Sequence, residues 1–420
     1  MKKVTAILIG GGQRGAQAYA SYALQYPNEL QFVGIAEPRA DRREAFCKKH
    51  GIEEKYCVES WEQILTFPRF ADFALICTQD SMHMEPLKKA MELGYDILCE
   101  KPISPVKEEL ITLRDKTEAY SGMISVAHVL RYSPFFRKIK EILDAGTIGE
   151  LINVQHMESI GYWHMAHSFV RGNWRNTEES SPIILAKCCH DFDILLWLTG
   201  KKCVSVSSFG STKLFKAENA PECAPKRCTD GCPHRSECAF YAPKFYLEHP
   251  KAVVDGFRRV VTMDESVEGL MDALKNGPYG RCVYACDNDV ADHQIVNMQM
   301  EDGLTISFTM SAFTNECDRT ITLQGSKGEI SGRMERDEII VTDFLTGNQT
   351  IYHLNTPKVG HSGSDAAMMK ELTALISQGR QRENISNATQ AIDSHLIAFA
   401  AEESRLNGGK VICLQGGMSE

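Results

Sequence analysis

A glycine-rich turn near the N-terminus constrains this chain more than any other stretch. Residues 7–15 read ILIGGGQRG, in which three glycines keep a G-x-G-x-x-G spacing between an apolar run and a helical pattern. In such turns the first glycine permits a tight bend, the second lets a pyrophosphate approach the backbone, and the third lets the helix pack closely on the strand. N–H groups at the start of the helix then face the phosphates. The predicted dinucleotide contacts in this turn are Gly10, Gly12, Gln13, Arg14 and Gly15.

An acidic residue at the end of the second predicted strand supports the same site. Glu37 closes the stretch FVGIAEP, 22 residues after Gly15, where a carboxylate can accept hydrogen bonds from the adenosine ribose hydroxyls. An acid there favours NAD over NADP because it repels a 2′-phosphate. Arg39, a further expected cofactor contact, and Arg42 follow closely, so NADP stays open as the alternative.

Alternating strand and helix patterns fill the first 124 residues. Short apolar strands such as FALICTQ and DILCEKP alternate with helices such as ADRREAFCKKHG. Continuous apolar strands separated by helices predict a parallel sheet that is covered on both faces. We therefore predict a doubly wound Rossmann domain over residues 1–124.

The pattern changes after residue 124. Segments such as CVSVSSFGSTKLF and RTITLQGSKGEISGRM alternate apolar and polar residues with period two, which predicts a mostly antiparallel open sheet with one face packed on helices. We expect residues 125–420 to form an α/β domain for substrate binding and oligomerisation. It would contain a cysteine-rich insertion at 215–250 and closing helices within 365–406, and the fold class is α/β.

Charge and hydropathy exclude several classes of partner. The formal net charge of −9 is spread over the 420 residues, without the basic stripe that binds nucleic acid. No apolar run approaches the ~18 residues that span a bilayer. The apolar start at residues 4–9 is too short for a secretory signal and leads straight into the glycines. We expect a cytoplasmic protein without nucleic-acid or membrane partners, in which thiols stay reduced and disulfides are the least expected use of the cysteines.

Motifs along most of the chain resemble one family of enzymes. The stretches CEKP, ICTQDSMH, AHVLRYSP and CCHDFDILLWLTG resemble the Gfo/Idh/MocA family of NAD(P)-dependent sugar and cyclitol oxidoreductases. The stretches AHSFVRGNW, ILAKCCHDFD, RCTDGC and CDNDVADHQ are similar to a cysteine-containing branch of that family. The resemblance implies a Rossmann domain, then an α/β domain with an open sheet, and NAD or NADP as the cofactor.

The resemblance also implies a catalytic lysine. Lys101 stands at the end of a predicted parallel strand, where open sheets bind their ligands, and the family implies a cis peptide before Pro102 that turns the lysine into the cleft. Lys101 would bind the cofactor ribose and the substrate hydroxyl and exchange a proton during oxidation. Its alternative is a surface lysine before a proline turn. The other cofactor contacts expected here are Thr78, Asp80, His83, Glu100 and His128.

A second candidate group lies in the stretch ILAKCCHDFD. Lys187, His190 and Asp193 are spaced three apart and are expected on one helix face. The wider family has an aspartate four residues before the histidine, where this chain has Ala186. The resemblance therefore suggests that Lys187 takes over part of the proton chemistry, or binds a sugar hydroxyl or carboxylate. His190 is a catalytic and substrate-binding candidate and Asp193 a substrate contact, with an ordinary helix hydrogen-bond network as the alternative.

The stretch GYWHMAHSFVRGNWRN is predicted to be the substrate-binding loop. Its mixture of side chains suits stacking on a pyranose face and binding of hydroxyls or an anionic group, although such aromatic residues often belong to a core or an interface. The predicted substrate contacts are Trp163, His167, Arg171 and Trp174, with Tyr162, His164 and Arg175 beside them. Arg131 in the crossover is a further predicted substrate contact that is expected to reach the nicotinamide side, and His361 is expected to approach the same cleft.

Four of the 15 cysteines lie within 16 residues. Cys223, Cys228, Cys232 and Cys238 stand in a proline-containing segment that cannot build its own core, so a metal bound by thiolates could supply the folding energy. Zinc suits four thiolates, an iron–sulfur cluster takes the same donors, and free buried thiols are the alternative. We expect a structural zinc site, because four thiolates leave no open position for a substrate. The resemblance leaves the fourth ligand open among Cys223, His234, Cys282 and Cys286.

These features predict an NAD-dependent oxidoreductase that transfers a hydride between nicotinamide and a secondary alcohol of a sugar, a polyol or a related carbohydrate. Two alternatives stay open. Some members of the resembled family use transient oxidation to cleave glycosides, and the acid missing at Ala186 allows a non-catalytic nucleotide-binding protein. The expected partners are a small carbohydrate and further copies of the chain, as a homodimer or homotetramer, since open sheets in the family pair face to face.

Overall fold

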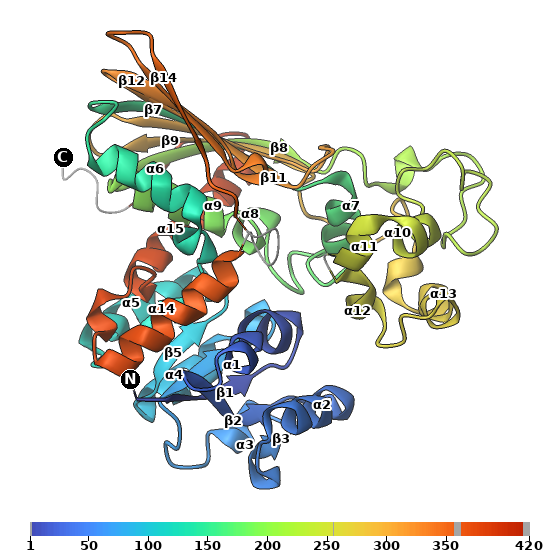
Figure 1. The fold of residues 1–420 in the computed structure, drawn as a ribbon. Coiled ribbons are helices and arrows are strands. Elements are labelled where there is room, and N and C mark those ends of the chain that lie inside the picture. The colour runs from blue at the N-terminus through green and yellow to red at the C-terminus, as the bar shows by residue number, and fades with distance from the viewer. Residues whose placement is uncertain (1, 255, 357–362, 415–420) are drawn as a thin grey trace.

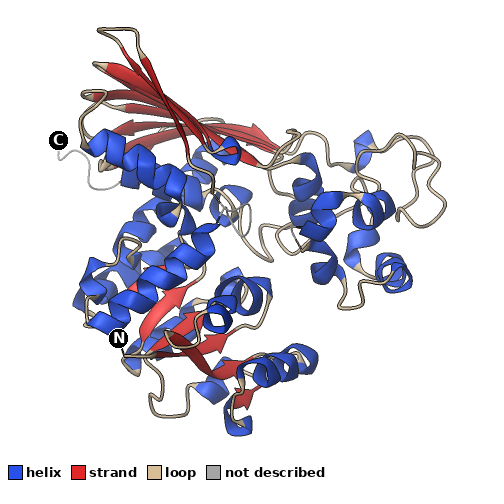
Figure 2. Ribbon diagram, viewed as in Figure 1, coloured by secondary structure: helices blue, strands red, loops and turns tan. Residues whose placement is uncertain are grey.

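Two β-sheets with different strand patterns organise the chain (Figure 2). The structure is a computed structural model, and it describes residues 2–254, 256–356 and 363–414. One sheet holds the N-terminal strands, and the other holds the strands from residue 151 onward (Figure 1). The predicted α/β class is confirmed.

The first sheet is a six-stranded parallel sheet with the order β3-β2-β1-β4-β5-β6. Neighbouring residues of β1 contribute to two separate cores, Ala6 and Leu8 to one and Ile7 and Ile9 to the other. Because both faces are covered, β4 and β5 are buried at every residue instead of alternating. The predicted doubly wound sheet is therefore confirmed. Its strands are β1 (Val4–Ile9), β2 (Leu30–Ala36), β3 (Cys57–Val58), β4 (Phe73–Ile76), β5 (Asp96–Cys99) and β6 (Ile124–Val126). Its helices are α1 (Ser21–Gln25), α2 (Ala40–His50), α3 (Trp61–Ile64), α4 (Met84–Glu92) and α5 (Lys107–Ala119).

Two helices from the far end of the chain pack on this first sheet. They are α14 (Ser364–Gln378) and α15 (Ala388–Leu406), which lie in the segment predicted to close the fold. Leu372 of α14 joins the core on one face of the sheet, and Ile392 of α15 joins the core on the other. Strand β6 is hydrogen-bonded to β5, so the first sheet continues across residue 124.

The second sheet has nine strands in the order β14-β13-β12-β11-β7-β10-β9-β8-β15. Its pairs are antiparallel except for β7 with β10. One face packs on α6, α9 and α15 (Figure 1). The other face carries exposed apolar side chains such as Phe209 opposite Ile295. The predicted open, mostly antiparallel sheet is confirmed. Its strands are β7 (Leu151–Ser159), β8 (Cys203–Ser211), β9 (His293–Met300), β10 (Thr305–Ser311), β11 (Asp318–Gly325), β12 (Gly328–Arg333), β13 (Glu338–Asp343), β14 (Gln349–His353) and β15 (Ile412–Cys413). The helices before β8 are α6 (Pro134–Asp144), α7 (Tyr162–His164), α8 (Ile183–Ala186) and α9 (Cys189–Thr199).

A helical unit is inserted between β8 and β9 (Figure 1). Its helices enclose an apolar cluster that includes Trp163, Tyr246, Phe257 and Leu274. The unit continues well past the predicted limit of residue 250, because the later segment is amphipathic and packs on α10. None of the described helices is long and apolar enough to cross a membrane. The helices of the insertion are α10 (Ala242–Glu248), α11 (Pro250–Val254), α12 (Phe257–Val261) and α13 (Val267–Asn276).

One pair of cysteines departs from the expectation of reduced thiols. Cys47 near the end of α2 and Cys57 at the start of β3 form a disulfide with an S–S distance of 2.03 Å. The short connection between α2 and β3 brings their Cα atoms to 6.4 Å, which the cysteine spacing alone does not reveal. The expectation fails for this pair, while the other cysteines are free.

Candidate active site

The glycine-rich turn connects β1 to the helical segment η1 (Gln13–Tyr19). A Cβ on Gly15 would lie 2.4 Å from the Gly10 carbonyl oxygen, and a Cβ on Gly10 would lie 2.5 Å from that of Cys77. The close approach of strand, turn and helix therefore requires glycine at both positions. Gly12 differs, since a Cβ there would meet nothing closer than Nη1 of Arg42 at 4.0 Å. The open space beside Gly12 fits a pyrophosphate lying against the backbone.

Glu37 lies beside this turn and turns its carboxylate toward it. The residue is 5% exposed and accepts hydrogen bonds from the backbone N–H of Gly11 at 2.7 Å and of Arg39 at 3.0 Å. A carboxylate has about four acceptor positions, so positions remain for ribose hydroxyls. The guanidinium of Arg39 pairs with Asp41 at 2.9 Å. The residues at this end of the cleft fit the adenosine half of a dinucleotide.

Arg14 and Glu100, both predicted cofactor contacts, belong to an ionic network. Arg14 Nε donates to Glu100 Oε1 at 2.9 Å, and its Nη2 donates to Asp365 at the start of α14 at 2.7 Å. Tyr19 donates its hydroxyl to the same Glu100 oxygen at 2.5 Å. Burial acts to raise the pKa of Glu100, but Arg14 and Lys101 outweigh it and hold that pKa below its ordinary value. The network fixes the glycine-rich turn to the end of β5 and to α14.

Lys101 follows β5 and precedes a cis peptide bond to Pro102, as the resemblance implies. Its Nζ donates to the carbonyl oxygen of Ala186 at 2.6 Å. His83 holds the same loop, because one of its ring nitrogens lies 2.7 Å from the Pro102 carbonyl oxygen and the other 3.1 Å from that of Thr78. Lys101 therefore bridges the two domains at the point where β5 ends.

Lys187, His190 and Asp193 were predicted to share one helix face, but they do not lie on one continuous helix. Helix α8 ends before Lys187 and α9 begins after it, so this lysine lies at a break between two helices. Its Nζ lies 3.1 Å from Oε1 of Glu158, which is fully buried on β7. The three-residue spacing predicts one face only for a continuous helix, and here Lys187 turns toward β7.

Asp193 and two residues predicted near the nicotinamide, Arg131 and His128, are buried. Asp193 pairs with Arg131 through both carboxylate oxygens, at 2.7 and 2.8 Å, and both side chains are buried. Nε2 of His128 lies 3.8 Å from Asp193, and neither ring nitrogen of His128 has a hydrogen-bond partner among the described residues. Burial lowers the pKa of His128 well below its ordinary value, so the ring is neutral. Its ring centre lies 5.5 Å from that of His190, which is 5% exposed.

Three residues predicted to contact substrate lie in the core of the insertion. Trp163 is 5% exposed within the apolar cluster. Nδ1 of His167 lies 2.6 Å from a tyrosine hydroxyl of α10, and burial lowers the pKa of His167 to about 3. Arg171 donates to the carbonyl oxygens of Phe240 at 2.6 Å and Arg281 at 2.7 Å. The structure therefore places these three buried side chains in or beside the core of the insertion, and their contact with substrate stays a prediction.

Trp174 is the member of the predicted loop that contacts the first domain. It is 37% exposed, and its Nε1 lies 3.2 Å from both carboxylate oxygens of Asp80. Ser180 and Ser181 donate their hydroxyls to the same carboxylate at 3.1 and 3.3 Å. Asp80, which follows β4 and is a predicted cofactor contact, thus links the first domain to the second. The predicted cleft residue His361 lies outside the described residues.

The insertion also reaches the glycine-rich turn. A Cβ built on Gly256, between α11 and α12, would lie 3.1 Å from Nε2 of Gln13. Gly256 has a φ of +72°, a backbone conformation that glycine adopts readily. A dinucleotide lying at Gly12 would therefore have the insertion beside it.

Sequence reasoning missed an ionic cluster formed by β7, α9 and β11. Glu158, Asp191 and Arg319 are buried, and Arg319 lies 2.8 Å from each of the two acids. His156 Nε2 lies 2.8 Å from Asp191. A signal for the cluster was present, because His156 and Glu158 alternate in phase with Val154 on the core-facing side of β7, where apolar residues are expected.

The structure does not support the predicted zinc site. Across residues 2–254, 256–356 and 363–414, no group of three or more His, Cys, Asp or Glu side chains is arranged to hold a metal ion. Cys223 is exposed, whereas Cys228 is buried because its backbone pairs with the segment that follows Tyr279. Arg171 donates to the carbonyl oxygen of Phe240 in this loop, and Cys228 packs in the apolar cluster. These contacts hold the loop without a metal, contrary to the prediction that it needs one to fold.

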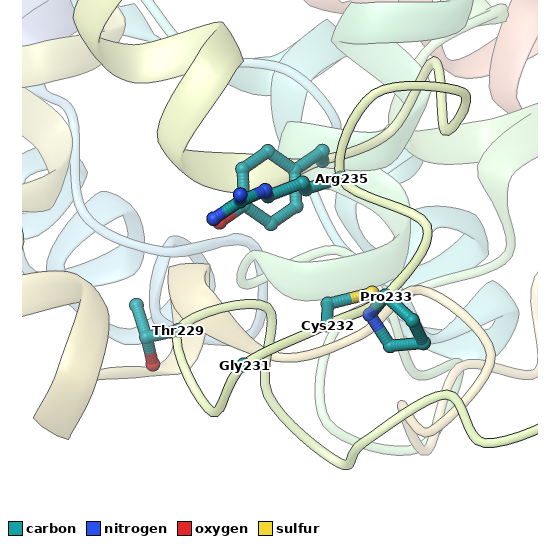
Figure 3. A pocket seen from close by; sticks show the side chains of 6 residues that line it. Thr229, Gly231, Cys232, Pro233 and Arg235 are labelled. Atoms are coloured by element: carbon teal, nitrogen blue, oxygen red, sulfur yellow. The ribbon is translucent and has the colours of Figure 1, made fainter.

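A polar hollow of about 450 Å³ opens in the cysteine-containing loop (Figure 3). Figure 3 shows Cys232 and Pro233 on one side of it and Arg235 on another. Cys232 is the only one of the four predicted metal ligands that lines this hollow. Its lining residues are Thr229, Gly231, Cys232, Pro233, Arg235 and Tyr241.

Two sequence patterns of one protein family match the chain. The NAD-binding Rossmann fold of the Gfo/Idh/MocA oxidoreductase family matches residues 4–128, and the C-terminal alpha/beta domain of the same family matches residues 140–413. The chain belongs to the Gfo/Idh/MocA oxidoreductase family. The motifs that resembled this family are thereby confirmed, as is the order of its two domains.

Individual relatives are distant. YteT of Bacillus subtilis (strain 168), assigned as an oxidoreductase, is 23% identical over 370 residues, which is 83% of each chain. The scyllo-inositol 2-dehydrogenase (NAD(+)) of the same organism is 27% identical over 212 residues, 50% of this chain and 57% of that one.

Solved structures share the fold over nearly the whole chain. A levoglucosan dehydrogenase in complex with NADH and levoglucosan has a TM-score of 0.70 at 18% identity and covers 98% of this chain and 100% of that one. An oxidoreductase from Agrobacterium radiobacter in complex with NAD+, L-tartaric acid and magnesium has a TM-score of 0.69 at 15% identity, with 98% of each chain covered.

Proposed function

We propose that this chain is an NAD-dependent oxidoreductase that transfers a hydride between nicotinamide and a secondary alcohol of a sugar, a polyol or a related carbohydrate. The observation that carries the proposal is the position of Lys101, whose amine leaves the end of β5 and reaches the Ala186 carbonyl oxygen in the other domain at 2.6 Å. A ligand between the glycine-rich turn and α9 would meet that amine. Family membership supports the oxidoreductase class.

NAD is the proposed cofactor, with NADP as the alternative. Residues 1–124 would bind it, with the pyrophosphate beside Gly12 and the adenosine ribose at Glu37, and residues 125–420 would bind the substrate. When bound, NAD accepts the hydride from the carbinol carbon. Within the described chain, two backbone N–H groups are the donors to the Glu37 carboxylate, so acceptor positions remain for the ribose hydroxyls.

The proposed proton chemistry lies with Lys101. It takes the proton of the substrate hydroxyl, with His190 and Lys187 as the assisting groups. The neutral imidazole of His128 stands behind His190 and adds no charge to the site. Trp174, joined to Asp80, borders the same space and restricts the entry of water.

Nucleotide binding and turnover test this proposal separately. Lys101→Met should retain NAD binding, measured by fluorescence titration, and lower NADH formation with a panel of sugars by about 10²–10⁴-fold. Lys201→Met, which changes an exposed lysine paired with Asp302 on the far sheet, should alter neither. Full turnover by Lys101→Met would remove the role given to that lysine. Failure of the protein to bind either nucleotide would reject the class of enzyme.

A glycosidase that acts by transient oxidation and elimination is the second candidate. It is favoured by the position of Gly256 against Gln13, because an insertion beside the bound cofactor would slow its release. Glycoside cleavage without accumulation of NADH would support it. The acid missing at Ala186 motivates a third candidate, a non-catalytic nucleotide-binding protein, which NAD binding without turnover of any sugar would support.

We also propose that the open face of the second sheet pairs with another copy of the chain. Phe209 of β8 and Ile295 of β9 lie opposite each other on this face and are exposed at 52% and 43%. Phe209→Glu should lower the mass measured by light scattering from that of a dimer or tetramer toward that of a monomer, because a charge at this position would be buried at the interface.

A further inference from the structure

A histidine of the C-terminal helix α15 contacts the loop that carries Lys101. His395 is fully buried, and it follows Ala391 and Ile392 on the buried face of the helix, where an apolar residue is expected. Its Nε2 accepts a hydrogen bond from the backbone N–H of Ile103 at 3.0 Å, although the two residues are 292 positions apart. A buried polar ring is costly unless its nitrogens are paired, so the partners of His395 account for its place in the core.

The partners of the ring fix its tautomer. Nδ1 of His395 lies 2.6 Å from the carbonyl oxygen of Ala391, one turn earlier in the helix, and a carbonyl oxygen can only accept. Nδ1 therefore carries the proton, and Nε2 keeps the lone pair that accepts from the N–H of Ile103. Burial lowers the pKa of His395 to about 3, so the ring is neutral and keeps this acceptor at neutral pH.

Ile103 stands two residues beyond Lys101, and the backbone between them has little freedom. Pro102, which separates them, has a φ fixed by its ring. Before the lysine, the N–H of Glu100 donates to the last carbonyl oxygen of β4 at 2.8 Å. Within the described chain, Nε2 of His395 is the acceptor for the N–H of Ile103. The backbone of the lysine is thus held to the sheet on one side and to α15 on the other.

His395 joins this loop to a helix that packs on both domains. Ile392, three residues before it, packs in a core of the first sheet, and Ala398, three residues after it, packs in the core of the second. His83, whose ring lies 2.7 Å from another carbonyl oxygen of the loop, belongs to the first domain alone. The hydrogen bond of His395 therefore sets the position of the Lys101 loop relative to both domains.

Resting on the oxidoreductase function proposed above, we propose that His395 is a positioning residue for the reaction, which accepts the N–H of Ile103 and so holds the amine of Lys101 at the substrate hydroxyl. Proton transfer requires the base within hydrogen-bond distance of that hydroxyl, and a displacement of about 1 Å can lower the rate about 10²-fold. Without its acceptor the buried N–H of Ile103 would be left unpaired, and the loop would shift to find another partner. His395 acts through the backbone of the loop and need not touch the substrate.

The tautomer of His395 tests the acceptor role without a substrate. In protein with isotope-labelled histidine, NMR at neutral pH should show a neutral ring with its proton on Nδ1, and this signal should be missing in His395→Gln. A proton on Nε2, or a charged ring, overturns the proposal, because neither form can accept from the N–H of Ile103.

Substitutions of His395 test the effect on turnover, measured as NADH formation with the sugar that the parent oxidises fastest. His395→Leu cannot accept a hydrogen bond, so kcat should fall about tenfold or more, while NAD affinity should stay that of the parent. His395→Gln keeps a side-chain oxygen as the acceptor and should recover most of the turnover. If His395→Leu does not fold, His395→Asn, whose amide is one methylene shorter, replaces it and should turn over more slowly than His395→Gln. A folded variant without the acceptor that keeps the kcat of the parent overturns the proposal.

A control on the same helix separates positioning from stability. Ile392→Val removes one buried methylene group from α15 and should lower the melting temperature without changing kcat. His395→Leu should lower kcat even when turnover is measured well below its melting temperature. An equal fall of kcat in Ile392→Val would make the effect one of helix stability and overturn the positioning role.

A double variant shows whether His395 acts through Lys101. Lys101→Met lowers turnover by itself, and adding His395→Leu should cause no further fall, because the amine that the loop positions is already gone. A further fall by the same factor as in the parent overturns the positioning role.

Failure of this inference is distinguishable from failure of the proposed function. A parent protein that binds neither nucleotide, or that oxidises no sugar of the panel, contradicts the proposed function and the positioning role with it. Turnover by the parent that is unchanged in His395→Leu leaves that function intact and contradicts the positioning role alone.

Discussion

The glycine-rich turn and the helical insertion differ in how their residues find their partners. In the turn, Gly15 lies against the carbonyl of Gly10 and Gly10 against that of Cys77, which directly follows the neighbouring strand β4. The contacts of this turn follow from backbone geometry that the glycine spacing itself encodes. A motif whose chemistry depends on the local backbone is therefore predictable from sequence.

The insertion behaves in the opposite way. Trp163, His167 and Arg171 have the composition of a sugar-binding loop, yet they form the core of a helical unit. Arg171 finds its acceptors at Phe240 and Arg281, 69 and 110 residues further along the chain. Composition alone does not distinguish a binding loop from a polar core, because both use aromatic rings and buried hydrogen bonds.

Among the changes that test this comparison, a substitution of Arg171 is expected to have the largest effect on stability. Arg171→Met should lower the free energy of unfolding by about 2–5 kcal/mol, because two partly buried carbonyl oxygens lose the donor that the buried guanidinium supplies. Chemical denaturation followed by circular dichroism measures the change. The exposed Arg235→Met should stay within about 0.5 kcal/mol of the parent. A loss of turnover at Arg171→Met without a loss of stability would return Arg171 to the substrate site.

Two glycines of the turn should separate packing from cofactor binding. Gly15→Ala should cost about 1–3 kcal/mol of stability, since its Cβ would lie 2.4 Å from a carbonyl oxygen. Gly12→Ala should leave stability nearly unchanged and weaken NAD binding about tenfold or more, because its Cβ would occupy the space that fits the pyrophosphate. Thermal unfolding and fluorescence titration measure the two effects. Unchanged NAD affinity in Gly12→Ala would place the cofactor elsewhere.

Because His167 is buried beside the core of the insertion, the stability of the folded protein should fall at low pH. Burial lowers the pKa of His167 from its ordinary value to about 3 in the folded protein. The folded state therefore favours the neutral ring. This contribution to the free energy of unfolding is complete above about pH 6.5 and is lost as the pH falls toward 3, so that the loss is about 2 kcal/mol at pH 5. His167→Gln should flatten the dependence of the unfolding free energy on pH in that range. The same slope in parent and variant would show that the ring is not buried as described.

The smallest expected effect concerns the predicted metal ligands. Cys223→Ser should change stability by less than about 0.5 kcal/mol because Cys223 is exposed. The buried Cys228→Ser should cost about 1 kcal/mol or more, since a hydroxyl replaces a thiol in an apolar cluster. Treatment with a chelator should leave the melting temperature unchanged. One bound zinc per chain that is lost in Cys223→Ser would restore the thiolate site.

The elements of the fold were predictable wherever burial is periodic. Strand β9 alternates buried and exposed residues along its length, and β4 is buried throughout, so both were found from their hydrophobic pattern. Strand β14 has no such pattern, because it lies at the sheet edge and is exposed at nearly every residue. The insertion was predicted to end at residue 250, whereas its helices continue through α13. These later helices carry no cysteines that would have marked them in the sequence.

The candidate site was predictable where the position of a residue follows from a local pattern in the sequence. The resemblance named Lys101, and its position at the end of β5 follows from the parallel sheet. The spacing of Lys187 and His190 was taken for a continuous helix, but α8 ends before the lysine. Glu158 was missed although its polar side chain stands in phase with the buried face of β7.

The sequence by itself determined the family, the parallel sheet with its glycine-rich turn, and the open second sheet, because glycine spacing and hydrophobic period act through the local backbone. Only the tertiary structure decided the partners of Arg14, Lys187 and Arg171. A buried charge or donor must be matched by an acceptor, and these acceptors come from distant segments that no local spacing identifies. For that reason Arg14 fixes the glycine-rich turn, Lys187 pairs with a buried glutamate of β7, and Arg171 donates hydrogen bonds within the insertion.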